Sequence, residues 1–527
     1  MAILSEKEQI AVLSAPVQLP CGRWLRNRLV KAAMEEMLGE GGLPGELDRA
    51  LYEAWSEGGW GMLISGNVMV SPDHLGTPFD ITVPASFPPS ERVSKAFSAW
   101  ANSCRSPSSS VTTPGRPDEH PTLKVLQLNH PGRQSLRFLC GRSPSAPSLA
   151  PSSVPLSAGA GPLGALLGRA LWGTPREMSA QDVEEVVKGF VRGARLAKET
   201  GWDGVELHAS HGYLLAQFMS PKVNRRCDDY GGSARKRLAL LLRIIDAIRE
   251  ELPHSEGFVV GVKLNSSDYV KGGLTEQDAL DNIKWIAEHG GVDFIEISGG
   301  SYESPEFMST STADHPHLRP SSAAREAFFD TFSHRARWLL STLPPSTLPS
   351  PPPLVLLTGG FRTRLGMTRA LHTSTKSPPT ADLVGLARPA AVAPSLPLRL
   401  LSPAVPGPEA RAPVYDPLSG VRWLRWLFGW IAVAGPGLDV VWHTMVLRQV
   451  ALRRRKEKKR RRELYGEEKN GGGGGVVARA GAEDAYPLSN FWVMALRVFV
   501  VPLVPAWLVG VAGAVVVAVV GKRWSVF

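Results

Sequence analysis

Two histidines and a tyrosine stand close together in the stretch VELHASHGYLLAQFMSPKVNRRCDDYGGS, residues 205–233. His208, His211 and Tyr213 lie at the end of the apolar run GVELH, where a strand would stop and a loop begin. Imidazole groups bind metals or exchange protons near neutral pH, and a phenol can donate a hydrogen bond or a proton. Taken alone, the histidines could be metal ligands, buried structural groups or catalytic groups. The tyrosine could be a packed aromatic ring or a proton donor.

Eight short apolar runs, separated by helical patterns, provide the elements that would position these residues. Runs that are apolar at nearly every position suit strands covered on both faces, as in a parallel sheet. Residues 233–252 repeat apolar residues at helical spacing, and Ser179 can cap the helix that precedes strand four. Eight strand-then-helix units predict a (β/α)8 TIM barrel, of the α/β class. The expected strands are residues 28–34, 61–67, 123–129, 204–208, 258–264, 293–298, 354–360 and 382–388.

Polar residues and glycines gather where the expected strands end. The loops that follow the strands of such a barrel all face one mouth, so these residues would lie together. At the ends of strands seven and eight, glycine N–H groups beside an arginine could hold a phosphate. The residues are Glu35, Asn67, Gln127, His208, His211, Tyr213, Lys263, Ser298, Gly299, Gly359, Gly360 and Arg388.

The long motif HxxHGYLLxQFxSPxxNxRxDxYGGS resembles that of the old yellow enzyme family of FMN-dependent NAD(P)H oxidoreductases. Shorter matches occur in the same order along the chain: NRLVKAAM, QLNHPGRQS, KLNSSDY, TGGFR and VGLARPA. The resemblance covers roughly residues 15–400. It implies FMN as the cofactor and NADH or NADPH as the hydride donor.

The resemblance implies which residues hold the flavin. Gln127 and Lys263 would contact its pyrimidine edge, where a cation stabilises the reduced form. Main-chain positions along the ring would come from Ala33, Met34 and Gly66. The phosphate site would be formed by Gly359, Gly360, Ala387 and Arg388.

The same resemblance gives the histidines and the tyrosine their roles. His208 and His211 would bind the carbonyl or nitro oxygen of the substrate, which makes the β-carbon electrophilic. Hydride from flavin N5 would go to that carbon. Tyr213 would protonate the α-carbon from the other side.

Three positions depart from the family pattern. Glu35 stands where a threonine or cysteine commonly tunes the flavin, and an acid near the ring would disfavour reduction. Ala387 replaces a glycine before the phosphate-binding arginine, although the main-chain N–H groups survive this change if φ stays negative. Lys236 replaces an asparagine that usually follows the YGGS motif.

Four further residues of the long motif are dense enough to look functional. We expect Asn224, Arg226, Asp228 and Tyr230 instead to order the loop through ion pairs and hydrogen bonds.

The composition is that of a globular protein, with 43% hydrophobic and 20% charged residues. The net charge is +10, but the run RRRKEKKRRR at 453–462 contributes +8 of it. The four cysteines, widely spaced along the chain, have no metal-ligand spacing, so no metal site is expected and a reducing compartment fits. The N-terminus lacks an apolar run of signal-peptide length, which favours a cytoplasmic protein.

The expected domains are a barrel followed by three segments that the resemblance leaves unexplained. The FMN-binding barrel spans residues 1–400, with Ser/Pro-rich insertions at 103–121 and 341–353 that we expect to be mobile surface loops. An apolar extension follows at 401–447, in which residues 423–446 favour an interfacial or packed helix over a spanning one. Then come a basic, Gly-rich linker at 448–490 and a candidate tail anchor at 491–527.

The tail is the candidate for membrane attachment. Residues 498–520 form 23 residues without a charge, long enough to span a bilayer. We favour a tail anchor facing the cytosol over a buried hairpin packed on the barrel. The basic run lacks interleaved aromatic residues, so an anionic membrane surface or a solvated helix face is favoured over nucleic acid.

Taken together, the sequence predicts an FMN-dependent ene-reductase. It would use NADH or NADPH to reduce an activated C=C bond in a small electrophilic alkene. The alternative is a membrane-tethered binding protein without catalytic activity, built on a degenerate barrel. The sequence carries no signal of oligomeric state.

Overall fold

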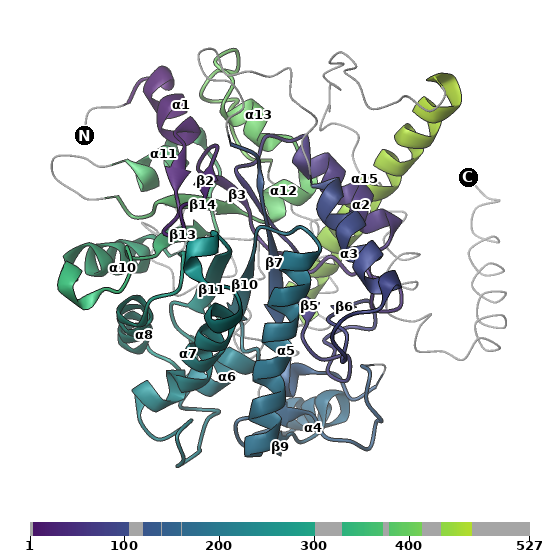
Figure 1. Cartoon of the computed structure of the whole chain (residues 1–527), viewed down its shortest axis with the longest axis vertical. Coiled ribbons are helices and arrows are strands. Elements are labelled where there is room, and N and C mark those ends of the chain that lie inside the picture. The colour runs from purple at the N-terminus through teal and green to yellow at the C-terminus, as the bar shows by residue number, and fades with distance from the viewer. Residues whose placement is uncertain are drawn as a thin grey trace. The chain divides into compact units, whose positions relative to one another are not determined.

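The computed structural model describes residues 4–104, 120–138, 140–159, 161–300, 329–372, 379–413 and 434–465. They belong to one compact unit, Met1–Ala478, and a second unit, Arg479–Phe527, lies outside the described ranges. In the described part, eight parallel strands pair in the order β3-β4-β7-β10-β11-β12-β13-β14, and β14 pairs with β3 to close a barrel. The predicted (β/α)8 barrel is confirmed (Figure 1). Its strands are β3 (Leu29–Lys31), β4 (Met62–Ile64), β7 (Leu123–Asn129), β10 (Gly204–Ala209), β11 (Val259–Asn265), β12 (Phe294–Ser298), β13 (Leu354–Thr358) and β14 (Leu383–Leu386).

Helices surround the strands because each strand is apolar on its outer face as well as its inner one. Ser179, the predicted cap, accepts from the Asp182 N–H and begins α5 as part of a capping box. The barrel helices are α2 (Glu46–Ser56), α3 (Glu91–Ser103), α5 (Ala180–Glu199), α6 (Leu214–Met219), α7 (Ala234–Glu251), α8 (Glu276–His289), α10 (Asp330–Thr342), α11 (Arg364–Leu371), α12 (Arg388–Val392) and α13 (Leu396–Leu400). The remaining elements are α1 (Glu6–Ser14), α4 (Gly161–Trp172), α15 (Ala434–Tyr465), β1 (Val17–Gln18), β2 (Trp24–Leu25), β5 (Val68–Met69), β6 (Ile81–Thr82), β8 (Leu149–Ala150) and β9 (Arg176–Glu177).

The amino end of the barrel is closed by the antiparallel pair β1–β2. The Cys21 N–H between these strands donates to Asp293 Oδ1 at 2.8 Å, and Arg23 Nε donates to the Gly257 carbonyl at 2.9 Å. Asp293 directly precedes β12, so the pair lies at the end where the strands begin. Leu19 and Leu25 pack there on the apolar side chains inside the barrel. The opposite, carboxyl end is therefore the open one.

The C-terminal helix α15 packs against the barrel helices α2 and α12 (Figure 1). Ion pairs join Arg454 to Glu57 and Lys458 to Glu53 of α2. Residues 434–465 form one continuous helix, so the structure shows no boundary at residue 447 and the basic run lies in a helix rather than in a linker.

Two other expected segments fall outside the described ranges, one of them in part and one completely. Of the insertion at 103–121, residues 105–119 are not described, whereas 341–353 run over the surface between α10 and β13. The candidate tail anchor, residues 498–520, also lies outside the description. Among the helices that the structure describes, none is long and apolar enough to cross a bilayer.

Candidate active site

A cavity of about 300 Å³ opens at the carboxyl end of the barrel strands. Every predicted site residue except Gly66 lines it, because each of them lies in the second half of a barrel strand or in the segment that follows the strand. The cavity wall thus holds Ala33, Met34, Glu35, Gln127, His208, His211, Tyr213, Lys263, Gly359, Gly360, Ala387 and Arg388.

Gly66 serves a different purpose, since it lies just behind the wall. A Cβ atom at this position would come within 2.7 Å of the Met34 carbonyl oxygen, so a glycine lets the ends of β3 and β4 approach each other. Its N–H does not face a ligand in the cavity, because it donates to the Tyr52 hydroxyl at 3.1 Å. Gly66 is not among the residues that line the cavity, and its contact with a flavin stays a prediction.

The two histidines are buried and held by hydrogen bonds. His208 lies in β10, and the Ser210 N–H approaches its Nδ1 at 3.4 Å. His211 has a left-handed backbone (φ +56°), which the hydrogen bond from its N–H to Asn265 Oδ1 (3.0 Å) supports. The ring centroids lie 5.2 Å apart. Burial lowers the pKa of both imidazoles well below the ordinary value, and the positive charge of Lys263 adds to this effect, so both are neutral at pH 7.

Tyr213 begins α6 and packs against the first histidine. Its ring centroid lies 4.7 Å from that of His208 at a steep angle, and the side chain is buried. The α6 helix places the phenol because the Tyr213 N–H is bonded to the Ser210 carbonyl and the Leu214 N–H to the His130 carbonyl. The sequence order H-x-x-H-x-Y therefore brings three polar groups to one wall of the cavity.

Gln127 and Lys263 are both engaged with buried carboxyl groups beneath the cavity. Gln127 Nε2 donates to Glu206 Oε2 at 2.5 Å, and Lys263 Nζ lies 2.8 Å from Glu296 Oε1. Burial and the negative charge of Glu296 raise the pKa of Glu206 well above its ordinary value. The protonated form of Glu206 is therefore favoured, while Glu296 forms the ion pair with Lys263.

The sequence reasoning missed these two acids, and also Asn265, which holds His211. The signal for the acids was present: GVELH and DFIEIS each carry one glutamate inside an otherwise apolar strand. A charged side chain in a strand that is covered on both faces needs an oppositely charged or hydrogen-bonding partner. A cation in a neighbouring strand was the partner to expect for such an acid. The register of β11 and β12 indeed places Lys263 opposite Glu296.

At the other end of the cavity, the chain forms a glycine-lined cradle. Gly359 and Gly360 have φ values of +115° and +79°, which only glycine adopts readily. Ala387 keeps a negative φ of −94°, so the position does not require the left-handed backbone that favours glycine. Arg388 follows directly and lines the same cavity.

The Glu35 side chain is hydrogen-bonded to two other residues of the cavity wall. Asn67 Nδ2 donates to Glu35 Oε2 at 3.1 Å, and a hydrogen bond joins the Glu35 carboxyl group to the Tyr213 side chain. Asn67 Oδ1 and Thr358 Oγ1 are buried polar atoms that find no hydrogen-bond partner within the described ranges, and both residues line the cavity. Unpaired polar atoms of this kind are expected where a ligand binds.

The C-terminal helix α15 supplies a wall that the sequence analysis did not expect. Val440, His443 and Leu447 line the cavity, one helical turn apart from each other. Thr444 Oγ1 donates to the Glu35 carbonyl at 3.2 Å and so joins the helix to the end of β3.

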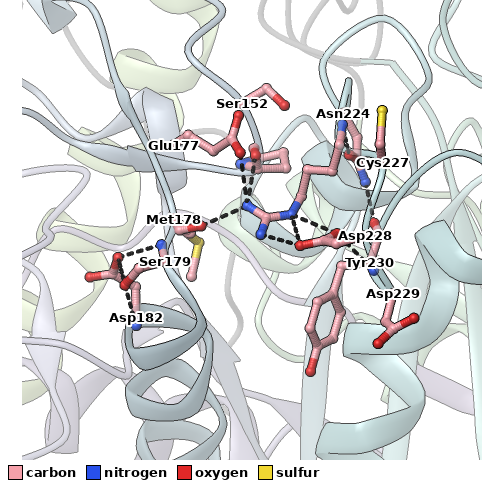
Figure 2. Close-up of polar contacts among 12 residues, drawn as sticks. Ser152, Glu177, Met178, Ser179, Asp182, Asn224, Cys227, Asp228, Asp229 and Tyr230 are labelled. Atoms are coloured by element: carbon pink, nitrogen blue, oxygen red, sulfur yellow. Dashed lines mark hydrogen bonds and ion pairs between the residues drawn. The ribbon is translucent and has the colours of Figure 1, made fainter.

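The four residues assigned to loop ordering belong to a network of polar contacts (Figure 2). None of them lines the cavity. Arg226 donates to the Met178 carbonyl at 2.6 Å and forms an ion pair with Asp228. Asn224 Nδ2 donates to the carbonyl groups of Phe218 and Tyr230, both at 2.7 Å. This network orders the loop after α6, as predicted, and also ties it to the segment before α5.

The histidine pair has no third metal ligand beside it among the described residues. Within the part of the chain that the structure describes, no group of three or more His, Cys, Asp or Glu side chains is placed to hold a metal ion. The cysteines Cys21, Cys104, Cys140 and Cys227 are unbridged.

Comparisons with known proteins agree with the fold and give the family of the chain. Residues 122–328 match the model of the NADH:flavin oxidoreductase / NADH oxidase family. The chain is 35% identical over 443 residues to the NADH-dependent flavin oxidoreductase iccE of Talaromyces variabilis, covering 83% of this chain and 98% of that one. It is 41% identical over 399 residues to iliE of Neonectria sp. (strain DH2), also a NADH-dependent flavin oxidoreductase, covering 75% of this chain but only 48% of the relative. Morphinone reductase shares the fold, with a TM-score of 0.53 and 21% identity over 74% of this chain and 88% of that one.

Proposed function

Since the chain belongs to the old yellow enzyme family of FMN-dependent NAD(P)H oxidoreductases, we propose that it reduces the activated C=C bond of an enone-type substrate. One observation carries the proposal. His208, His211 and Tyr213 share one cavity with Gln127 and Lys263 at the open end of the barrel. The polar groups needed to hold a flavin edge and to polarise a substrate oxygen are thus within one site.

The residues around the cavity fit a flavin mononucleotide. Gln127 and Lys263 would hold the pyrimidine edge, and the positive charge of Lys263 would favour electron density there. The main-chain N–H groups of Gly359 and Gly360 would hold the phosphate together with Arg388. When bound, FMN supplies the hydride that it has received from NADH or NADPH.

The histidine pair would bind and polarise the substrate oxygen. Because both imidazoles are neutral, each ring has one N–H group that can donate a hydrogen bond, and neither needs a negatively charged partner. The Ser298 hydroxyl lies 2.7 Å from His211 Nε2, so an oxygen atom fits at hydrogen-bond distance from this ring. A substrate oxygen would compete with Ser298 for the contact. Withdrawal of electrons from the C=C bond would then make the β-carbon the site of hydride addition.

Tyr213 would deliver the proton that completes the reduction. Its hydroxyl lies in the same wall as the histidine pair, so a substrate bound through its oxygen would have its α-carbon near the phenol. A positioned acid contributes about 10²–10⁴-fold to such proton transfers. Loss of the phenol should slow only the step that consumes the alkene.

The alternative of a binding protein on a degenerate barrel is not favoured. In that case we would expect packed side chains to fill the barrel mouth, whereas a cavity of about 300 Å³ remains there. The departures at Glu35 and Ala387 leave the cavity open.

An isotope experiment tests the proposed reaction. Full-length protein with FMN is incubated anaerobically with NADPH or NADH and 2-cyclohexenone as a model enone. Deuterium placed on the hydride position of the nicotinamide should appear at the β-carbon of cyclohexanone, and deuterium from heavy water at the α-carbon. Flavin that NADPH or NADH reduces but that leaves the enone unchanged would contradict the proposal.

A further inference from the structure

Glu35 occupies a position in the cavity wall that links the barrel, the tyrosine and the C-terminal helix. It follows β3 and lines the cavity. Asn67 holds one carboxyl oxygen at 3.1 Å, and Tyr213 is hydrogen-bonded to the same carboxyl group. Thr444 of α15 holds the Glu35 main-chain carbonyl at 3.2 Å. Asn67 therefore fixes the Glu35 side chain next to the phenol, and Thr444 fixes its main chain.

The surroundings of Glu35 oppose its ionisation. Burial raises its pKa to about 8, and the negative charges of Asp80 and Glu36 add to the effect. Hydrogen bonds from Asn67 and Tyr213 act in the opposite direction. The pKa of Asp80 is itself raised to about 6 by burial, despite hydrogen bonds from Thr77 and Gly76.

Other charged and titratable groups nearby do not reverse this balance. Glu36 is paired with the fully buried Lys31 at 2.8 Å. The imidazoles that share the cavity with Glu35 include His208 and His211, which are neutral, and His443 from α15. At pH 7 the Glu35 carboxyl group is therefore mostly protonated and can donate a proton.

We propose that Glu35 resupplies the proton that Tyr213 gives to the substrate, so that the two residues form a proton relay. The proposal rests on the proposed function, because it concerns the proton-transfer half of that reaction. Glu35 acts through Tyr213 and positions it, since a neutral carboxyl group can direct its own hydrogen toward the phenol oxygen.

The relay balances in protons and electrons. After hydride addition at the β-carbon, the Tyr213 O–H bond breaks and a C–H bond forms at the α-carbon. The Glu35 O–H bond then breaks and the Tyr213 O–H bond forms again. The Glu35 carboxylate finally takes a proton from water. Both electrons of the reduction come from NADH or NADPH.

The protonation of Glu35 also determines how strongly this acid would oppose reduction of the flavin. A charged carboxylate would disfavour flavin reduction, as expected from the sequence. A protonated Glu35 carboxyl group carries no charge, so below about pH 8 it opposes flavin reduction only weakly. The enzyme should therefore combine easy flavin reduction with efficient protonation below that pH, and lose both above it.

The test follows flavin reoxidation by 2-cyclohexenone in a stopped-flow instrument, with FMN-loaded, anaerobically reduced full-length protein. Glu35→Gln keeps the size and the hydrogen bonds but has no acidic proton. We expect reoxidation to slow by about 10-fold or more. The parent rate should fall as the pH rises through about 8, and this inflection should vanish in the variant. Glu35→Asp, which restores an acid, should recover part of the rate and an inflection.

A second variant tests the cause of the pH dependence. Asp80→Asn removes a negative charge close to Glu35 without changing a residue of the cavity wall. Ionisation of Glu35 becomes easier, so the inflection should move to lower pH. An unmoved inflection, or Glu35→Gln with the parent rate and pH profile, would overturn the relay.

Two further measurements separate the relay from the proposed function. Infrared difference spectra between pH 6 and pH 10, recorded without substrate, should show the loss of one more protonated carboxyl band in the parent protein than in Glu35→Gln, because Asp80 and Glu206 contribute equally to both. Identical difference spectra of the two proteins would overturn the relay. If Tyr213→Phe reoxidises as fast as the parent protein, the proposed role of Tyr213 fails, and the relay fails with it. If only Glu35→Gln behaves like the parent, the role of Tyr213 stands and only the relay is wrong.

Discussion

The strand ends of the barrel and the C-terminal helix line the same cavity in different ways. The barrel contributes polar groups fixed by buried hydrogen bonds, such as His211, held by Asn265, and Lys263, held by Glu296. The helix α15 contributes Val440, His443 and Leu447, and its distal half is joined to α2 by ion pairs at the surface. The barrel can therefore fix the geometry of the chemistry, whereas the helix shapes the space that a substrate fills. Substitutions in the two regions should differ in kind as well as in size.

The largest effect is expected for the histidine pair. In the variant His208→Ala/His211→Ala, nothing would polarise the substrate oxygen, and kcat/KM for 2-cyclohexenone should fall by about 10³-fold or more. Phenols should no longer produce their charge-transfer band, whereas FMN should remain bound. Titration with a phenol, followed by absorbance, checks the binding, and His289→Ala on the surface of α8 is the matched control. A charge-transfer band that persists in the double variant would contradict our assignment.

The second effect is expected at Tyr213. Tyr213→Phe keeps the packed ring on His208 but removes the hydroxyl. Reoxidation by the enone should slow by about 10²-fold, while flavin reduction by NADPH or NADH should keep its rate. Separate stopped-flow measurements of the two half-reactions check this. Equal slowing of both would indicate structural damage rather than loss of a proton donor.

A smaller effect of another kind is expected for α15. Val440→Ala enlarges the cavity by two methyl groups on the helix side. The KM for bulky enones should change by about 10-fold, in a direction set by the fit, whereas flavin reduction should be unaffected. Steady-state kinetics with a series of enones of increasing size would measure it. An unchanged preference across the series would show that the helix does not shape the substrate space.

The smallest effect is expected where α15 meets α2. Arg454→Ala and Lys458→Ala each remove a partly exposed ion pair, with Glu57 and Glu53. Each should lower the free energy of unfolding by less than about 1 kcal/mol, because solvent screens such pairs. Urea unfolding at low and high salt would show the difference shrinking as salt increases. A large, salt-independent loss would mean that these contacts hold the helix more firmly than their exposure implies.

The difference between the two regions also explains what could be predicted from the sequence. The barrel strands were readable because each is a short apolar run, and the rule that strand ends share one mouth then brought distant residues such as Gln127 and Arg388 together. The helix was not readable in this way. Its apolar half and its basic half differ in composition, so the boundary was expected at residue 447, inside what is one helix.

The sequence also could not predict which side chains of neighbouring strands contact each other. Glu206 and Glu296 were visible as lone acids, but which cation or amide each one meets depends on the stagger of the closed barrel. The same holds for Glu35. Its type marked it as a departure, whereas its contact with Tyr213 depends on how the ends of β3 and β10 meet in space.

The central claim is that a flavin lies in the barrel mouth and passes hydride to a substrate held by the histidine pair. The most direct measurement is the visible absorption spectrum of the purified full-length protein with FMN. We predict a flavin band that remains with the protein through gel filtration, bleaches anaerobically on addition of NADPH or NADH, and returns on addition of 2-cyclohexenone. A folded protein that retains no flavin, or a band that NADPH and NADH leave unchanged, would contradict the account.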